Sequence, residues 1–404
     1  MFVLYYLSDI QIGTDSLLNN FQMGVLDFLI KQKELHQLFR IDKNEILDDG
    51  EMKIQTFEFE SGKIPASDEY HVSTYNRDIV IKENARFNYP VFIPPHKGKA
   101  NSCILLFHGL NERNWDKYLC WAEYLASNTG KPVLMFPIAY HINRAPSLWS
   151  DPRRMSMLVD KRKIETGETK SLSFANAALS ERLSEDPYRF YSSGRQTIYD
   201  ITSLVRQIKN GEHPLFKPGT SVDIFAYSIG SFMAEILLMA NPENLFKKTK
   251  LFIFCGGSIF NSMFGESRCI MDKPAYDTLL RYYCKEWFGY IHQSVTCGGL
   301  AMDNVLSAFN SMIMPNVFKK KREIFFASAK QRISGISLVK DSVMPFSGVE
   351  ACMGNEMAYQ CFRLIDFPYE YTHESPFPTN GRVDEKVLNA SFLSVFQKAA
   401  SFLL

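Results

Sequence analysis

The short apolar run Cys103–Phe107 reads Cys-Ile-Leu-Leu-Phe and has almost no alternation of polar and apolar residues. A strand with this pattern is buried on both faces, which is typical of a parallel sheet. Other strand-like runs recur along the chain, with segments of helical spacing between them. This alternation favours an α/β protein with a mainly parallel sheet covered by helices.

We expect strands at 78–82, 87–93, 102–107, 132–137, 221–227, 250–255, 323–329 and 362–367. Helices are expected at 115–128, 198–209, 230–240 and 385–402. Residues 1–76 precede this alternation of strands and helices and are interpreted as an N-terminal appendage. Within them, Asp15 would cap a helix that runs to about Phe39, and Lys53–Glu60 carries a weak strand signal.

Two stretches interrupt the alternation within the domain at residues 77–404. Residues 147–195 are rich in charge and serine, and residues 258–322 are largely helical and heavy in aromatic side chains. Each follows the end of an expected strand, where parallel sheets place their ligand crevices. We interpret both as insertions that form a cap.

Composition excludes several classes of protein. The 404 residues are 46% hydrophobic and 22% charged, which is ordinary for a soluble globular chain. The 45 Lys and Arg nearly balance the 44 Asp and Glu, so no nucleic-acid partner is expected. No run of about 20 apolar residues occurs, so we expect no transmembrane helix. The first residues do not resemble a signal peptide, which makes the cytoplasm the expected location.

The eight cysteines form no Cys-x-x-Cys pair and have no histidine at zinc-ligand spacing. A reducing compartment fits this usage best, and we expect neither a metal nor a cofactor. The sequence does not fix the oligomeric state.

The sharpest functional signal is Ala226-Tyr227-Ser228-Ile229-Gly230, between an expected strand and an expected helix. A serine on such a tight turn has the pattern of a nucleophile elbow. The positions two before and two after the serine must be small, because the strand and the helix nearly touch there. Ala226 stands where glycine is commoner. The turn also places Ser228 at a helix N-terminus, which favours negative charge.

A second signal follows the strand that ends at Phe107, where the chain reads His108-Gly109-Leu110-Asn111. A strand that ends in His-Gly before a helix resembles the α/β-hydrolase loop that supplies one N–H to a tetrahedral oxyanion. This resemblance implies the backbone N–H groups of Leu110 and Ile229 as the two donors. Gly109 would let the backbone turn close to a substrate. We interpret His108 as a brace for this loop.

The third signal lies downstream of Ser228. Asp341 follows an expected strand in the stretch Lys340–Pro345, and His373 lies in a loop after the expected strand at 362–367. A serine hydroxyl becomes a good nucleophile when an imidazole takes its proton, and the imidazole needs a carboxylate to fix its tautomer. Asp366 and Glu350 are rival acids that are less well placed.

In that order, Ser228, Asp341 and His373 resemble the catalytic triad of the α/β-hydrolase superfamily, over about residues 77–404. The stretch from His108-Gly109-Leu110-Asn111-Glu112-Arg113 to Trp149-Ser150-Asp151-Pro152-Arg153 is also similar to an uncharacterised bacterial group within it. The resemblance implies an eight-stranded, mostly parallel sheet and cofactor-free hydrolysis of an acyl bond.

Two classes of function stay open. The first is a serine hydrolase that cleaves a carboxylic ester, a peptidase or an acyltransferase, with a small-molecule acyl substrate. The second is a non-catalytic binding module on the same fold. Residues near the expected site that could contact substrate are His108, Gly109, Tyr227, His141 and Arg144. His141, Asn143 and Arg144 could equally anchor the cap.

Overall fold

A computed structural model of the chain describes residues 27–46, 52–62, 78, 80–95, 98–296 and 303–404. One nine-stranded sheet runs through the centre of the molecule, in the order β1-β2-β3-β5-β4-β6-β7-β8-β9. The strands are β1 (Glu45–Ile46), β2 (Lys53–Glu60), β3 (Arg86–Ile93), β4 (Ala100–Phe107), β5 (Val133–Met135), β6 (Phe216–Tyr227), β7 (Leu251–Phe254), β8 (Ile333–Leu338) and β9 (Phe362–Ile365).

The sheet is parallel from β5 through β4 to β9, whereas β1, β2 and β3 pair with their neighbours in antiparallel fashion. The resemblance implied eight strands, and the sheet has nine, one of which is the two-residue edge strand β1. Of the eight runs expected as strands, six correspond to β3, β4, β5, β6, β7 and β9. The expected strand at 53–60 is confirmed as β2. It pairs with β3 over its whole length, so this part of residues 1–76 belongs to the sheet and does not stand apart from it.

Both faces of β4 are buried, as its unalternating sequence predicted. Cys103, Leu105 and Phe107 join the core on one side of the sheet. Ile104 and Leu106 join the core on the other side.

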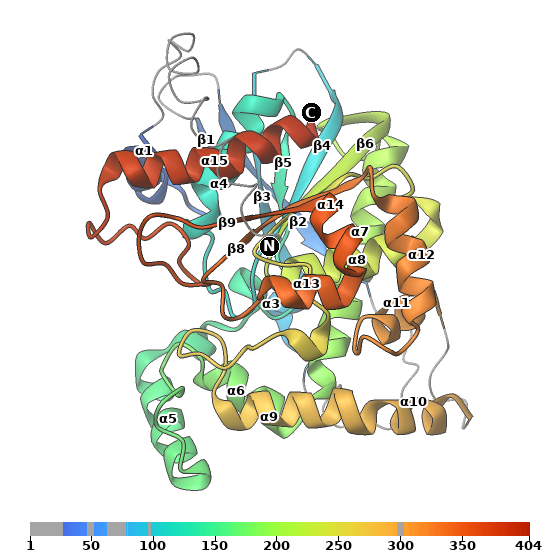
Figure 1. Ribbon diagram of the computed structural model, residues 1–404. Helices are drawn as coiled ribbons and strands as arrows, with labels where there is room; N and C mark the ends of the chain where they lie inside the picture. The colour runs from blue at the N-terminus through green and yellow to red at the C-terminus, as the bar shows by residue number, and fades with distance from the viewer. Residues whose placement is uncertain (1–26, 47–51, 63–77, 79, 96–97, 297–302) are drawn as a thin grey trace, which may run out of the picture.

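One face of the sheet is covered by α1 (Phe28–Leu38), α4 (Asp116–Thr129) and α15 (Glu385–Leu403), which pack on one another (Figure 1). The opposite core is formed with α7 (Tyr188–Asn210) and α8 (Ile229–Ala240), and α11 (Asn304–Ser311) packs on α8. Asp27 caps α1 by accepting a hydrogen bond from the N–H of Ile30, whereas the predicted cap Asp15 lies outside the described residues.

Three predictions of local structure were wrong. Residues 323–329 form part of the helix α12 (Lys319–Ala329), and the strand of this region is β8, four residues further on. The described residues of 78–82 contain no strand, and the short helix α3 (Lys82–Ala85) begins there. The helix expected at 198–209 is α7, which begins ten residues earlier, inside the first predicted insertion.

The first predicted insertion carries α5 (Pro152–Thr166) and α6 (Ala177–Glu185). The second carries α9 (Lys273–Arg281) and α10 (Trp287–Thr296), and α6 packs on α9. These four helices of the two insertions lie together below the sheet in Figure 1, whereas α11 of the second insertion packs on α8. The buried guanidinium of Arg162 on α5 binds the buried carboxylate of Asp272, at 2.7 Å, and so ties the two insertions together.

Within the described residues, no helix combines the length and the apolar character needed to cross a membrane. The same residues contain no group of three or more His, Cys, Asp or Glu side chains arranged to hold a metal ion.

Candidate active site

Ser228 lies at the junction of β6 and α8, in a backbone conformation that is rare for any residue other than glycine, with φ 56° and ψ −128°. Three hydrogen bonds hold this turn. The Ser228 N–H donates to the carbonyl of Phe254, and the hydroxyl of Ser231 donates to the Ser228 carbonyl and accepts from the N–H of Gly257. The strained turn is therefore held by the end of the neighbouring strand β7 and the residues that follow it.

The close approach that the sequence predicted around Ser228 is present. A Cβ atom placed on Gly230 would lie 2.7 Å from the carbonyl oxygen of His108 and 2.9 Å from the carbonyl carbon of Phe107. Ala226 is fully buried beside β4 and fits with its single methyl group. Glycine at position 230 thus lets the start of α8 rest against the end of β4.

The structure brings Ser228, His373 and Asp341 into one hydrogen-bonded chain. The Ser228 hydroxyl lies 2.7 Å from His373 Nε2, and His373 Nδ1 lies 2.8 Å from Asp341 Oδ2. All three side chains are buried. Ser228 follows β6, Asp341 follows β8, and His373 follows β9, so the three meet at the carboxyl edge of the parallel strands.

The second oxygen of Asp341 accepts hydrogen bonds from the N–H groups of Val343 and Met344, at 3.0 and 2.8 Å. Burial alone would raise the pKa of this carboxyl group. The charge and hydrogen bond of His373, together with these two N–H groups, outweigh burial and lower the pKa. The rival Asp366 instead accepts a hydrogen bond from Tyr371, and Glu350 lies on the helix α13 (Phe346–Met353).

Gly109 places the loop after β4 beside Ser228, because a Cβ atom on Gly109 would lie 3.4 Å from the Cβ of Ser228. Leu110 and Ile229 both line the small cavity that also contains Ser228. Ile229 is the first residue of α8, so its N–H has no acceptor within the helix. The two residues expected to supply the donors therefore line the same cavity as the serine.

His108 is fully buried, and both ring nitrogens are used inside the protein. Nδ1 lies 2.7 Å from the carbonyl of Gly109, and Nε2 accepts a hydrogen bond from the N–H of Ile138, which fixes Nδ1 as the protonated atom. Burial, reinforced by the charge of His141, holds the His108 pKa well below its ordinary value. His108 thus braces the loop and offers no free nitrogen to a substrate.

Tyr227 and Arg144 also serve the scaffold. The Tyr227 hydroxyl donates to the carbonyl of His373, and its ring stacks on the His373 ring at 5.4 Å between centroids. Arg144 is completely buried and binds Asp200 at 2.8 Å, together with Asn84. Arg144 therefore anchors the loop after β5.

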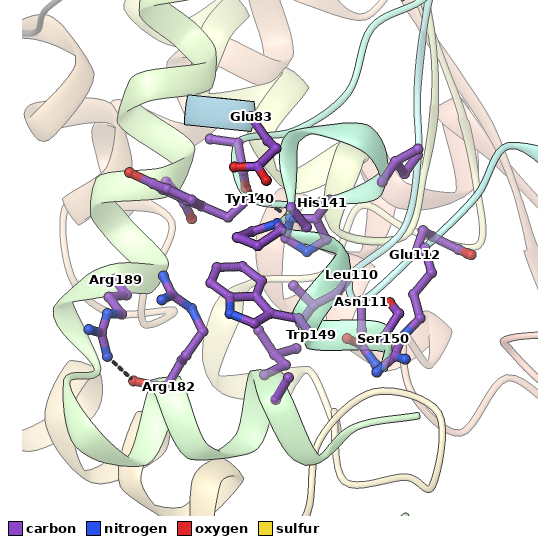
Figure 2. Close-up of a pocket in the computed structure, with 18 of the residues that line it drawn as sticks. Glu83, Leu110, Asn111, Glu112, Tyr140, His141, Trp149, Ser150, Arg182 and Arg189 are labelled. Carbon is purple, nitrogen blue, oxygen red and sulfur yellow. Dashed lines mark hydrogen bonds between the residues drawn. The ribbon is translucent and has the colours of Figure 1, made fainter. Parts of the chain in front are cut away.

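His141 lies on that same loop and lines a pocket of about 360 Å³, shown in Figure 2. Its Nδ1 lies 2.9 Å from the carbonyl of Ala139. Burial lowers its pKa to about 4, so the ring is neutral near neutral pH.

Sequence analysis missed a network beneath this loop. The N–H of Gly109 donates to the Tyr118 hydroxyl, at 2.9 Å, and that hydroxyl donates to Glu112, at 2.7 Å. Lys117 completes the network by binding Glu112 and lying over the Tyr227 ring, 5.1 Å from its centroid. Apart from Tyr227, these residues lie within ten positions of one another, but their contacts depend on how the loop after β4 folds back on the start of α4, which the sequence pattern does not show.

The sheet order, the serine at the strand-to-helix turn and the acid and histidine loops after β8 and β9 define an α/β-hydrolase fold. The chain belongs to the family described as "Family of unknown function (DUF6051)", whose model matches residues 11–404. The resemblance to a bacterial group stays a prediction.

No curated protein matches the chain. Among solved structures, it is similar to a vibralactone cyclase, with 11% identity, a TM-score of 0.44, and coverage of 94% of this chain and 86% of that one. It is also similar to an esterase of Pyrobaculum calidifontis, with 11% identity, a TM-score of 0.41, and coverage of 93% and 90%. A cold-adapted esterase from an Arctic intertidal metagenomic library shows 12% identity, a TM-score of 0.36, and coverage of 87% and 97%.

Proposed function

We propose that the protein is a serine hydrolase that cleaves a carboxylic ester through an acyl-enzyme intermediate. The observation that carries this proposal is the chain from the Ser228 hydroxyl through His373 to Asp341, at a strained strand-to-helix turn. A structural serine has no need of a buried imidazole at 2.7 Å that is itself oriented by a buried carboxylate.

In the proposed reaction, Ser228 Oγ attacks the ester carbonyl while His373 Nε2 takes the hydroxyl proton. The N–H groups of Leu110 and Ile229 stabilise the resulting oxyanion. His373 then gives its proton to the departing alcohol, which leaves an acyl group on Ser228. A water molecule, deprotonated by His373, attacks this acyl group. The bond from the acyl carbon to Ser228 Oγ then breaks, His373 returns the proton to Oγ, and the acid is released. Asp341 holds the proton on Nδ1 and stabilises the imidazolium at each step.

The proposal is tested by labelling with a fluorophosphonate, a probe that reacts with activated serines. We expect one label, at Ser228, on the wild-type chain and none on Ser228→Ala. The control is Ser328→Ala, which changes an exposed serine on α12 whose hydroxyl only donates to the carbonyl of Phe325.

The same variants are then assayed with p-nitrophenyl acetate. Ser228→Ala should lower kcat by several orders of magnitude, because the members of a triad act as a unit. Folded wild-type protein that takes no label and hydrolyses no ester would contradict the proposal, as would a label on a serine other than Ser228.

A further inference from the structure

Ser228 opens onto a small apolar cavity. The cavity measures about 40 Å³ and is shared by Ser228, Leu110 and Ile229. Its other walls come from α7, from the second insertion and from the acid loop, and include Phe190, Phe260, Met263, Met271, Leu279 and Met344. The hydroxyl of Tyr276, which also lines it, donates to the carbonyl of Met263, so it is satisfied within the protein.

A much larger and more polar pocket adjoins this cavity. It measures about 360 Å³ and is bounded by Leu110 and Phe190, which also bound the small cavity. Figure 2 shows the labelled side chains of this pocket: Glu83, Glu112, Tyr140, Trp149, Arg182 and Arg189. Acidic and basic groups are both present, so the lining suits a neutral polar ligand better than an ion.

The aromatic wall of the large pocket is held in place by charge. The Arg182 guanidinium lies 4.1 Å from the centroid of the Trp149 ring, and Arg182 is itself fixed by Asp78 at 2.9 Å. Large amphipathic rings such as tryptophan combine an apolar face with a polar handle, which suits a ligand that has both characters.

The loops that line the large pocket hold three residues other than glycine in left-handed backbone conformations. These are Asn111, Tyr140 and Ile142, with φ of 61°, 65° and 51°. For Ile142 this is costly, because its side chain is β-branched. The Ile142 N–H donates to the carbonyl of Glu112, which holds the turn. Strained backbone of this kind clusters at ligand sites.

From these two unequal cavities, and resting on the proposed hydrolase function, we infer that the substrate is an ester of a short acyl group with a bulky, neutral, polar alcohol. The cavity at Ser228 measures about 40 Å³ against about 360 Å³ for the large pocket, so it is the space for the smaller, acyl part of the ester. Its apolar lining suits the acyl group. The hydroxyl-bearing alcohol, such as a sugar, occupies the large polar pocket.

Phe190 limits the acyl chain. A second apolar cavity, of about 50 Å³, shares Leu110, Phe190 and Ile229 with the first but does not include Ser228. Removal of the Phe190 ring opens the space at Ser228 toward this second cavity. The expected preference for a short acyl chain thus has one structural cause, the Phe190 ring, which a single substitution removes.

The acyl assignment is tested with p-nitrophenyl esters of acetate, butyrate, hexanoate and octanoate. We expect wild-type kcat/KM to fall at least tenfold from butyrate to octanoate. Phe190→Ala should raise the octanoate-to-acetate ratio of kcat/KM at least tenfold. Met271→Ala enlarges the same cavity from the side of the second insertion and should also raise the octanoate-to-acetate ratio. This variant replaces Phe190→Ala in the test if Phe190→Ala does not fold.

The matched control for these variants is Met155→Ala. Met155 is a buried methionine of the cap like Met271, but it packs in the separate cluster of α5 and α6 and lines neither cavity. Its substitution should leave the octanoate-to-acetate ratio unchanged.

The alcohol assignment is tested with acetate esters of different alcohols, and the rate of acetate release is measured. Wild-type kcat/KM should be at least tenfold higher for a monosaccharide acetate than for methyl acetate. Trp149→Ala should reduce this ratio at least fivefold. The control is Leu148→Ala, which changes an exposed neighbour on the same short helix, Ser147–Ser150, that does not line the pocket.

The outcomes distinguish a failure of the inferred substrate from a failure of the proposed hydrolase function. Fluorophosphonate labelling of Ser228 together with a preference for octanoate, or for methyl esters of large polar acids, overturns the inference and leaves the hydrolase proposal standing. The absence of both labelling and turnover in folded protein overturns both.

Discussion

Substitution of Gly230 by alanine tests whether the fit between α8 and β4 sets the geometry of the site. The added methyl group would lie 2.7 Å from the carbonyl oxygen of His108 and 2.9 Å from two atoms of Phe107. Ordinary contact begins near 3.4 Å, so helix and strand must separate by about 0.5–0.7 Å. Two of the three atoms belong to the backbone, which cannot rotate away as a flexible side chain can.

Overpacking of this kind costs about 1–3 kcal/mol of folding free energy. The loss of activity should be larger than this loss of stability. The displaced strand end carries the loop with Leu110, whereas Ser228 and Ile229 move with the helix, so one oxyanion donor shifts relative to the serine. A misplacement of about 1 Å can cost 10²-fold in rate, and we expect a loss of kcat of about 10- to 100-fold.

The assay pairs urea unfolding with the kinetics of p-nitrophenyl acetate hydrolysis. Gly289→Ala is the control, because Gly289 lies on α10 with no atom within 4 Å of the added methyl group. That variant should gain about 0.5–1 kcal/mol from the lower entropy of alanine in the unfolded chain and keep its kcat. Gly230→Ala with wild-type stability and wild-type kcat would refute the reasoning.

Three further predictions concern the acid, pH and the cap. Asp341→Asn should lower kcat by about 10³- to 10⁴-fold, because an amide no longer fixes the His373 tautomer, and an unchanged kcat would exclude Asp341 as the acid. As pH falls from about 6.5 toward 4, the unfolded chain protonates His141 before the folded chain does, so the free energy of unfolding should fall, by up to about 1.4 kcal/mol per pH unit for this residue; urea titrations should show a shallower fall in His141→Gln. Arg162→Ala leaves the carboxylate of Asp272 buried and unpaired, which should cost about 3–5 kcal/mol and make the cap sensitive to limited proteolysis; resistance equal to that of the wild type would contradict this role of the ion pair.

The core of the fold was predictable because its signals are local. Cys103–Phe107 lacks alternation since both of its faces are buried. The pattern Ala226–Gly230 marks its own turn, because the strand and the helix that flank it leave no room for larger side chains. The closing helix expected at 385–402 is α15, which is capped by the carboxylate of Asp384.

The prediction of secondary structure failed where contacts between distant residues determine whether a segment forms a helix or a strand. The run Ile324-Phe325-Phe326 has strand-like composition, yet it forms α12, with Phe326 buried and Ile324 exposed. The strand that replaces it carries Gly335, a weak strand former. A Cβ atom there would lie 2.4 Å from the ring of Phe362 on the neighbouring strand, so glycine is required by a contact that the local sequence does not reveal.

The division between scaffold and cap also explains which functional features the sequence left open. Ser228, Asp341 and His373 follow the strands β6, β8 and β9, so the parallel sheet fixes where the segments that carry them begin. The walls that would select a substrate come mainly from the insertions and from irregular loops, whose contacts are set by long-range pairs. One such pair joins Ser267 of the second insertion to Glu374, beside His373, at 2.5 Å. Because this contact joins the second insertion to the histidine loop, we expect changes in the insertions to alter the walls of the cavities while the three hydrogen-bonded side chains keep their geometry.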